Sequence, residues 1–493
     1  MENNMLFKRD IHVINGFNGD ILGYDVSSML TISLNQIAAK ILSFPMPISL
    51  EKVIELLELN GFTRNDILAN LEAMKKFKIL SEKPLPKDTK SCGEGCSHDK
   101  TKVGGLTMNI CHSCNMRCDY CFASGGNYKM KEEFMGEKTI KNSIDYLFDN
   151  ISSSDIIMVS FFGGEPFMNW DGIKTGINHC NERNKAVNKK MIFYITTNGT
   201  LVTREHLEFL AQFDVRITVS LDGDRDVNDK HRFFIDGSSA FDKTVKAIEL
   251  IVSYPQITLQ VRPTVDEYGS TKIIETANFL ESLGVTRIHF RPMSSLDGTK
   301  LVLTKNGYKS MAEGFECLAK KMIDQAQKGK ELIDYVNILK FLFLLFFRLR
   351  RQFYCGAGST VISVDPSGNI SPCPRFTGMG EFQIGDIHCG GVVEKKQSEF
   401  QAFSIKTRPD CNNCWVKNIC AGGCLYMHEI DEHGNDDFSV WCELMKSNVE
   451  SALKTFVFLQ KLSPAILPSL IREYPPLLSK TEEALLQYEK HLK

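Results

Sequence analysis

The sequence of 493 residues predicts an α/β fold built on a partial (β/α)6 barrel of the TIM type, with a winged-helix-like unit before it and a cysteine-rich region after it. Strand-like and helix-like segments alternate six times from residue 106 onward, which favours parallel strands joined by right-handed crossovers. Short strands mix with amphipathic helices before residue 80, and cysteines are dense between 355 and 442. The predicted regions are 1–80, a linker at 81–105, the barrel at 106–330, the cysteine-rich region at 331–450 and a helical tail at 451–493.

The first region combines strand-like pieces with helices in which apolar residues recur every three or four positions. That mixture is typical of a small winged-helix unit. The linker that follows is rich in Lys, Pro, Ser and Gly. The strand-like pieces are "DIHVING", "ILGYDV" and "MLTISL", and the helical ones are "NQIAAKILSF", "SLEKVIELLELNG" and "TRNDILANLEAMKKFKIL".

The barrel region supplies six strand candidates with amphipathic segments between them. In barrels of this kind the chemistry lies at the carboxyl ends of the strands, so polar motifs at those ends are the first candidates for a site. The strands are "LTMNI", "DIIMVSFF", "MIFYITT", "VRITVSL", "ITLQVRPTV" and "TRIHFRPM", and the helices include "EKTIKNSIDYLFDN", "REHLEFLAQF", "FDKTVKAIELIVSY" and "TKIIETANFLESLG".

The remaining chain is rich in loops and then mostly helical. A hairpin is expected at "ISVDPSGNIS", because Pro366 and Gly368 suit a tight turn. In the tail, prolines at 464, 468, 475 and 476 are expected to interrupt the helix.

Composition and charge exclude several classes of protein. The 58 basic and 60 acidic residues leave a formal net charge of -2, which argues against binding to nucleic acid or to a membrane surface. The first residues lack the apolar core of a secretion signal, and the apolar run at 341–347 is too short to span a bilayer, so a cytoplasmic location is expected. Because a reducing compartment does not maintain disulfides, the 16 cysteines favour metal binding.

Three cysteines follow the first barrel strand with the spacing Cys-x3-Cys-x2-Cys: Cys114, Cys118 and Cys121. Three thiolates on one loop can bind three irons of a cubane and leave the fourth iron open for another ligand. A zinc knuckle or a chance crowding of cysteines is the alternative that the loop alone leaves open.

This spacing, with Tyr120 and Phe122 beside the last cysteine, resembles the signature of radical S-adenosylmethionine (SAM) enzymes. The resemblance implies that Cys114, Cys118 and Cys121 are catalytic and hold a [4Fe-4S] cluster. The unique iron of that cluster binds the amino and carboxylate groups of SAM, and reductive cleavage yields methionine and a 5'-deoxyadenosyl radical.

The motifs at the next strand ends continue the resemblance in the expected order. "FFGGEP" resembles the motif that meets the SAM amino group, "TTNGT" and "VSLDG" offer polar groups to the ribose, and an arginine in "LQVRPTV" suits the SAM carboxylate. Taken singly, these motifs are also ordinary turns or a structural ion pair. The implied cofactor-binding residues are Tyr120, Phe122, Gly163, Gly164, Glu165, Asn198, Ser220, Asp222 and Arg262.

The second group of cysteines resembles the SPASM domain, an extension of radical SAM enzymes that carries two auxiliary [4Fe-4S] clusters. A zinc ribbon is the alternative, since Cys-x2-Cys pairs also bind zinc. By the resemblance, Cys411, Cys414, Cys420 and Cys442 hold one auxiliary cluster, and Cys355, Cys373 and Cys424 hold the other.

In the family, a closed first auxiliary cluster has a fourth cysteine several residues before the one at 355; "FFRLRRQFYCG" has no cysteine besides Cys355, so the resemblance implies an open ligand position. A substrate thiolate could fill that position, or Cys389, Cys317 or a remote residue could close it. The sequence gives no assignment for Cys92, Cys96 and Cys111, and Cys180 is expected on a helix in the core or at the surface.

The first region resembles the recognition elements of maturases of ribosomally made peptides, which take a leader peptide as an added β-strand. A DNA-binding winged helix is the alternative. Residues 1–80 carry eight Lys or Arg against nine Asp or Glu, so the basic surface of a DNA reader is missing.

Together these resemblances imply a radical SAM/SPASM peptide maturase with an N-terminal leader-recognition element, nearest to the sactipeptide and ranthipeptide thioether synthases. The expected reaction takes a hydrogen from a residue of a Cys-containing precursor and closes a Cys-to-carbon thioether, with flavodoxin or ferredoxin as electron donor. Within the enzyme class the alternatives are formylglycine formation, as in sulfatase maturases, and a carbon-carbon or ether crosslink. The non-enzymatic alternative is an iron-sulfur electron carrier or a redox sensor.

Overall fold

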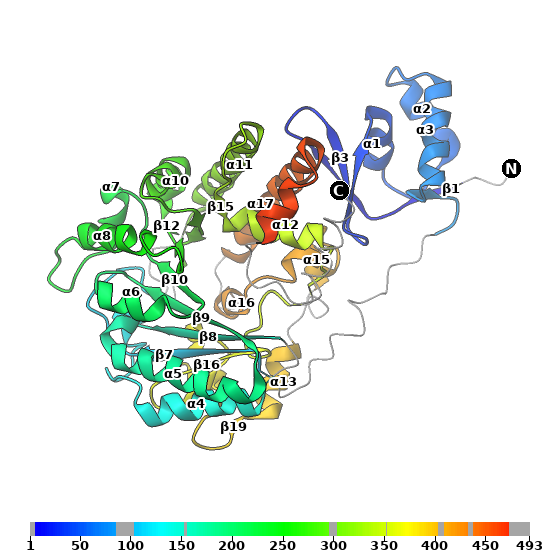
Figure 1. Ribbon diagram of the computed structural model, residues 1–493. Helices are drawn as coiled ribbons and strands as arrows, with labels where there is room; N and C mark the ends of the chain where they lie inside the picture. The colour runs from blue at the N-terminus through cyan, green and yellow to red at the C-terminus, as the bar shows by residue number, and fades with distance from the viewer. Residues whose placement is uncertain are drawn as a thin grey trace.

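The computed structural model describes residues 5–84, 103–151, 155–294, 303–351, 353–402, 409–431 and 437–472. The predicted linker lies mostly outside the described residues, as do Cys92 and Cys96. The first and the barrel regions are each built around a buried apolar cluster. Figure 1 shows the first region, in blue, beside the larger barrel body.

The first region contains two small antiparallel sheets and three helices. The apolar faces of all three helices meet in one core, which includes Ile41, Leu57 and Ile67. Each helix begins at a side-chain cap, Asn35, Ser49 or Thr63, which accepts a backbone N–H bond. The elements are β1 (Met5–Lys8), β5 (Ile48–Ser49) and β6 (Leu80–Ser81); β2 (Ile11–Asn15), β3 (Ile21–Asp25) and β4 (Leu30–Leu34); and α1 (Gln36–Ser43), α2 (Leu50–Glu58) and α3 (Arg64–Lys76).

The barrel is a curved sheet of parallel strands, as the sequence predicts. Its strands follow one another along the sheet in chain order, from β7 to β15. Helices cover the outer face of the sheet (Figure 1). The strands are β7 (Gly105–Cys111), β8 (Ile156–Gly163), β9 (Lys190–Thr197), β10 (Val215–Val219), β11 (Thr258–Val261), β13 (Arg287–Ile288) and β15 (Asp334–Tyr335); the helices are α4 (Glu137–Asp149), α5 (Trp170–Val187), α6 (Arg204–Leu210), α8 (Phe241–Val252), α10 (Ile273–Ser282) and α11 (Lys305–Gln327).

Two predicted strands are interrupted in the structure. "ITLQVRPTV" ends as a sheet strand at Val261 and resumes as β12 (Thr264–Val265), and "TRIHFRPM" divides into β13 and β14 (Arg291–Pro292). β12 and β14 pair with each other in parallel, apart from the main sheet. Proline lacks the N–H that a central strand donates, so Pro263 ends the pairing there.

The cysteine-rich region extends the same sheet. β16 (Val361–Val364) lies parallel to β7, and the predicted hairpin joins it to β17 (Asn369–Ser371). Gly368 in that turn has a φ of +100°, which glycine adopts readily. The other elements are β18 (Gly385–Asp386), β19 (Gly391–Val392), α13 (Glu394–Ala402), α14 (Pro409–Asn412), α15 (Lys417–Cys420) and α16 (Leu425–Asp431).

Three further helices, α12 (Val336–Phe346), α17 (Asp437–Leu462) and α18 (Ile466–Arg472), pack together beside α11. The apolar run "FLFLLFF" forms part of α12, whose side chains are mostly buried against α17 and α18. Among the described helices, none is long and apolar enough to cross a membrane. Pro464 separates α17 from α18, whereas Pro468 lies in the first turn of α18, where a helix tolerates proline.

Candidate active site

The cysteine loop follows β7 at the carboxyl end of the sheet. Arg117 ties the loop together, because its guanidinium donates to the carbonyl oxygens of Cys114 (2.9 Å), Met116 (2.9 Å) and Gly125 (3.1 Å). Gly126 has a φ of +106°, and a Cβ added there would lie 2.7 Å from the Cβ of Cys114. The loop conformation therefore depends on its glycines.

The glycine motif after β8, Gly163 and Gly164, packs against this loop. A Cβ on Gly163 would lie 2.3 Å from the carbonyl oxygen of Cys111, and one on Gly164 would lie 2.1 Å from that of Ser113. Two backbone bonds join the segments, Gly164 N–H to Cys111 O (2.7 Å) and Glu165 N–H to Ser113 O (2.9 Å). A side chain at either glycine would therefore clash with the backbone of the cysteine loop.

The three cysteines of the loop are electrostatic neighbours. Burial raises the pKa of Cys114 to about 12 and that of Cys118 to about 11, and Cys121 contributes to both shifts. Neutral thiols are therefore favoured until a cation lowers their pKa, which is what iron does on binding. Three thiols on one loop fit the donor set of a cubane with an open iron.

Glu165 is fully buried, and its carboxylate accepts three hydrogen bonds from the protein. Its carboxylate accepts bonds from Thr197 Oγ1 (2.7 Å), the Asn198 N–H (2.8 Å) and the Phe167 N–H (3.1 Å). Burial raises the pKa of Glu165, and these bonds oppose the shift. The carboxylate thus joins the ends of β8 and β9, and its predicted contact with SAM remains a prediction.

The partly buried Tyr120 and the buried Asp222 and Arg232 form a chain of hydrogen bonds beside the cysteine loop. The Tyr120 hydroxyl donates to Asp222 (2.5 Å) and accepts from Arg232 Nη1 (2.9 Å). Asp222 also accepts the Thr264 N–H (2.9 Å). The predicted ribose ligand Asp222 is therefore engaged by the protein itself, and it links the loop to β12.

His231 adds a second link to the same loop. Its Nδ1 lies 2.9 Å from Asp119, between two of the loop cysteines in sequence, and its Nε2 lies 3.0 Å from Asp266. Asp266 caps α9 (Glu267–Ser270). The hydrogen bond to Asp266 is the main cause that raises the pKa of His231 to about 9, so the ring is protonated at neutral pH. No motif in the sequence marks His231 or Arg232 as part of the site.

The other residues predicted to contact SAM differ in how many of their hydrogen-bonding groups already have a partner within the protein. Asn198 donates to Asn115 Oδ1 (2.9 Å), and its own oxygen accepts from Thr200. The backbone N–H of Ser220 donates to the carbonyl oxygen of Thr197 at the end of β9. The Nε atom of Arg262 is buried without a hydrogen-bond partner among the described residues. Arg262 therefore has unused donor capacity that an anion such as a carboxylate would satisfy.

Phe122 lies between the cysteine loop and the cysteine-rich region. Its ring stacks on Phe162 at 6.2 Å, and the guanidinium of Arg375 lies 5.4 Å from its centre. Arg375 follows Cys373 on a 3-10 helix (Pro374–Phe376).

The remaining cysteines of the predicted sets influence one another's pKa values, and their assignment to clusters stays a prediction. Burial, followed by the neighbouring Cys442, Cys414 and Cys411, raises the pKa of Cys420 to about 12. Burial, with Cys424 and Cys355 among the neighbours, raises the pKa of Cys373 to about 12. No three described His, Cys, Asp or Glu side chains converge on a single metal-ion position. In a cubane each thiolate binds a different iron.

The other described cysteines lie outside these sets. Cys317 and Cys389 are exposed, and Cys180 is buried on α5. Cys111 is buried, and its thiol lies 3.1 Å from the carbonyl oxygen of Ser113, which it donates to.

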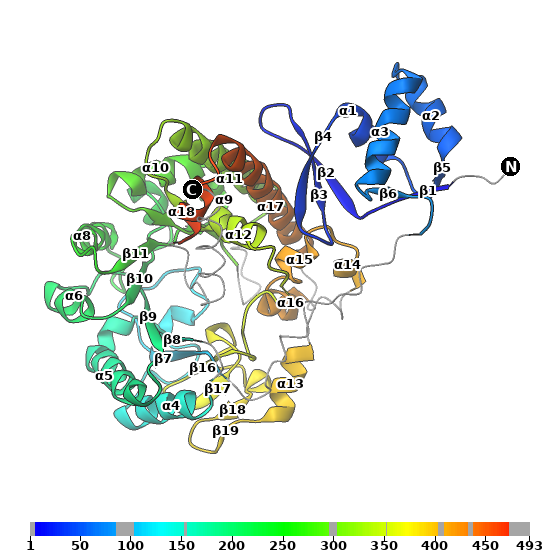
Figure 2. The ribbon, with the colours of Figure 1, turned by 45° about the vertical axis from the view of Figure 1, so that its right-hand side comes forward.

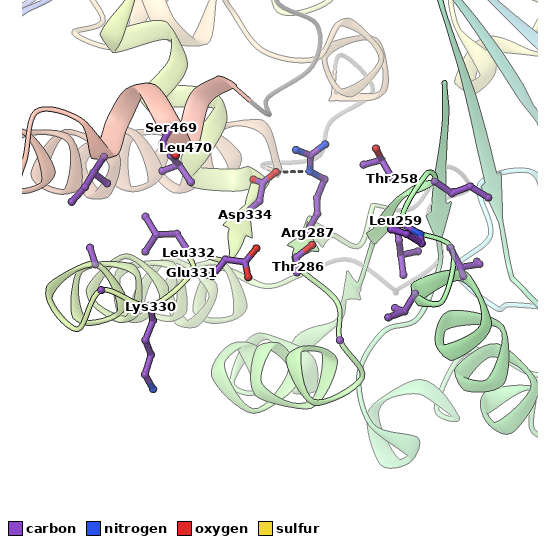
Figure 3. A pocket seen from close by; sticks show the side chains of 18 of the residues that line it. Thr258, Leu259, Thr286, Arg287, Lys330, Glu331, Leu332, Asp334, Ser469 and Leu470 are labelled. Carbon is purple, nitrogen blue, oxygen red and sulfur yellow. Dashed lines mark hydrogen bonds and ion pairs between the residues drawn. The ribbon is translucent and has the colours of Figure 1, made fainter. Parts of the chain in front are cut away.

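One cavity of about 770 Å³ lies at the opposite end of the strands (Figure 3). Its lining comes from the amino ends of β11, β13 and β15 and from α18, and it includes the ion pair of Arg287 and Asp334. The cysteine loop is at the carboxyl ends, so this cavity is separate from the candidate active site.

Comparisons with known proteins agree with this geometry. Residues 108–280 match the family described as "Radical SAM superfamily". Radical SAM cyclopropyl synthase TigE of Paramaledivibacter caminithermalis is 24% identical over 348 residues, covering 66% of this chain and 68% of that enzyme. A cysteine-type anaerobic sulfatase-maturating enzyme of Clostridium novyi is 24% identical over 362 residues, covering 71% of this chain and 95% of that enzyme.

A solved structure described as "Native anSMEcpe with bound AdoMet and Cp18Cys peptide" shares the fold. It superposes with a TM-score of 0.61 at 17% identity, covering 72% of this chain and 98% of that chain. The predicted radical SAM barrel is thus confirmed. The chain contains a radical SAM domain, and the family implies a [4Fe-4S] cluster and SAM as its cofactors.

Proposed function

We propose that this radical SAM enzyme forms a Cys-to-carbon thioether crosslink in a ribosomally made precursor peptide. The observation that carries the proposal is the set of three thiols at Cys355, Cys373 and Cys424, in which Cys424 and Cys355 both act on the thiol of Cys373. A [4Fe-4S] cluster on three protein thiolates has room for a thiolate from the substrate. The set at Cys411, Cys414, Cys420 and Cys442 has the four thiols that a closed cluster needs.

The position of the three-thiol set supports a role beside the reacting carbon. Cys373 precedes Arg375, and Arg375 lies over Phe122 next to the cysteine loop. β16 places the cysteine-rich region directly beside β7, from which the loop emerges. A peptide cysteine held there would lie near the carboxyl end of the barrel.

The residues of the chain position the reaction, and the cofactors supply the difficult chemistry. When bound, the loop cluster and SAM supply a radical that can take a hydrogen atom from carbon. The net change removes two hydrogens from the peptide: one leaves carbon as an atom, and the other leaves the thiol as a proton. One electron must also leave, and the auxiliary cysteine sets are the proposed place for its acceptor.

The test is anaerobic reaction of the reconstituted chain with SAM, dithionite and the peptide encoded by a short Cys-rich reading frame beside the gene. We expect 5'-deoxyadenosine and a peptide that has lost two hydrogens and resists alkylation of one cysteine. A carbon-carbon or ether crosslink would leave every thiol open to alkylation. A formylglycine product would instead react with a hydrazide, and an electron carrier or redox sensor would release no 5'-deoxyadenosine.

A matched pair of variants tests the role of the three-thiol set. Cys373→Ala should retain SAM cleavage and lose thioether formation. Cys180→Ala changes a cysteine on α5 outside the predicted sets and should retain both. Equal product yields from the two variants would refute the proposed substrate site.

The leader-recognition role of the first region is part of the proposal. Within the described residues β4 pairs only with β3, so its other edge is open to an added strand. Deletion of residues 1–80 should weaken binding of the leader peptide far more than SAM cleavage in the absence of peptide. Equal loss of both would assign the region a structural role.

A further inference from the structure

The side chain of Asn109, on β7, contacts the segment that follows Cys373. Its Nδ2 donates to Thr377 Oγ1 (2.7 Å) and to Ser363 Oγ on β16 (3.3 Å). The side chains of Asn109, Thr377 and Ser363 are all buried. Because the backbone pairing between β7 and β16 ends one residue before Asn109, this side chain extends the contact toward the cysteine loop.

A short hydrogen-bonded segment connects Thr377 to Cys373. In the 3-10 helix between them, the Phe376 N–H donates to Cys373 O (3.0 Å), and the Thr377 N–H donates to Pro374 O (3.3 Å). These two backbone bonds span the whole interval from Cys373 to Thr377. A bond that holds Thr377 against β7 therefore also restricts where Cys373 can lie.

The same segment meets the cysteine loop at two other points. The guanidinium of Arg375 lies 5.4 Å from the centre of the Phe122 ring. A Cβ added to Gly378, which has a φ of +82°, would lie 2.8 Å from the carbonyl oxygen of Tyr128. Phe122 and Tyr128 both follow the last cysteine of the loop. Thr377 lies between these contacts in sequence, so its bond to β7 completes the attachment of the segment.

The amide of Asn109 is better explained by position than by packing. Asn109 is 0% exposed, and its Oδ1 has no hydrogen-bond partner among the described residues. Burying an unpaired polar atom is unfavourable, and an apolar side chain of similar volume would avoid that cost. The Nδ2 group is the part of the amide with a use, because it joins β7 to Thr377.

We propose that Asn109, through Thr377, is a positioning residue that fixes the three-thiol set relative to the cysteine loop. The inference rests on the proposed function, in which that set holds the substrate thiol beside the reacting carbon. The thiol and the carbon must lie within bonding reach, and a displacement of about 1 Å can slow such a reaction about a hundredfold. Asn109 itself makes and breaks no bond.

Four variants isolate the bond between Asn109 and Thr377. Thr377→Val keeps the shape of the side chain and removes the hydroxyl, whereas Thr377→Ser keeps the hydroxyl and is the matched control. Asn109→Leu removes the donor at nearly the same volume. The double variant of Asn109→Leu with Thr377→Val should lose no more than either single variant, because the two residues are proposed to act as a pair.

The first measurement compares two products of the full-length chain reconstituted with iron and sulfide. It reacts anaerobically with SAM, dithionite and the peptide encoded beside the gene. We expect Asn109→Leu, Thr377→Val and the double variant to lower the ratio of thioether to 5'-deoxyadenosine about tenfold. SAM cleavage and a content of about 12 irons should be retained, and Thr377→Ser should keep the parent ratio.

Three results of this measurement would overturn the inference. A ratio unchanged in every variant would show that the bond is unimportant. A parallel fall in SAM cleavage, iron content and thioether would assign Asn109 and Thr377 a structural role. A further tenfold loss in the double variant would mean that the two residues act separately.

The second measurement needs no peptide. Electron paramagnetic resonance of the same chains with dithionite reports the spin–spin interaction between reduced clusters, which weakens with distance. Thr377→Val should change this interaction, and Thr377→Ser should retain it. An interaction identical in all variants would reject the inference, whether or not a thioether is formed. A changed interaction in Thr377→Val, when the parent forms no thioether, would reject the proposed function and retain the positioning role.

Discussion

His231 is held between two carboxylates, and it joins the cysteine loop to the end of the barrel. Asp119 belongs to the loop, and Asp266 caps α9, so a protonated ring between them restrains both segments. Neither carboxylate adjoins His231 in sequence. Only the fold reveals this contact.

The raised pKa of His231 predicts how stability depends on pH. Because the folded-state pKa is about 9 and the ordinary value is 6.5, the stabilisation is complete below pH 6.5 and is lost as the pH rises through 9. His231→Gln should therefore lower stability by about 1–2 kcal/mol at pH 6, after allowance for solvent screening. Denaturant unfolding at pH 6 and at pH 9.5 measures this. A deficit that grows with pH would contradict the assignment.

Replacement of the three loop cysteines is expected to remove one cluster and leave the other two. Replacing Cys114, Cys118 and Cys121 with Ala should abolish SAM cleavage, because the loop has no other thiol and the buried Cys111 belongs to β7. The two other cysteine sets should still bind about eight irons. Iron analysis and assay of 5'-deoxyadenosine measure the two effects separately, and persistent SAM cleavage would refute the role of the loop.

At the scale of elements, the glycine motif after β8 supports the cysteine loop. Gly164→Ala would place a methyl group 2.1 Å from the carbonyl oxygen of Ser113, so the loop must move. We expect a loss of about 1–3 kcal/mol in stability and reduced iron binding by the loop. Gly136→Ala is the control, since no atom lies within 4 Å of its added Cβ. Equal stability of the two variants would show that the close approach is unimportant.

The long, periodic elements of this fold are predictable from the sequence, and the short ones are not. The strands β7 to β10 and the helices α4 and α8 follow from apolar periodicity. β1, β5 and β6 are two to four residues long and carry too little pattern. Pro263 signals the end of β11, but the apolar residues on both sides of it make the segment look like one continuous strand.

The candidate site was predictable to the extent that its residues lie in local motifs. The cysteine sets and the strand-end motifs have fixed spacings, so the sequence alone indicates them. His231, Arg232 and Asn337 act through contacts across long stretches of chain, and nothing near them in sequence marks them. The internal bonds of Glu165 and Asp222 likewise depend on how neighbouring strand ends meet.

At the scale of the whole molecule, the first region is docked on the cysteine-rich region. The ring of His12 on β2 stacks on Trp415 with centres 3.9 Å apart, and Asn418 donates to the carbonyl oxygen of Val26 (2.6 Å). Trp415 and Asn418 lie between Cys414 and Cys420. Figure 2 shows β2 and β3 next to α15, which belongs to this segment. The residues between two predicted cluster ligands thus form part of the docking surface.

This arrangement predicts that docking depends on Trp415. The buried Tyr24 and Val26 of β3 and its following turn belong to the same apolar cluster as the barrel, so undocking would expose them to water. Trp415→Ala should speed hydrogen exchange of β2 and β3 at least tenfold, equivalent to about 1.4 kcal/mol. Exchange of β8, distant from the docking surface in sequence, should be unchanged, and Trp441→Phe is the matched control on α17. Unchanged exchange in the Trp415→Ala chain would mean that the salt link of Lys461 to Asp20 (2.6 Å) and the bond of Asn418 hold the first region without the stacked ring.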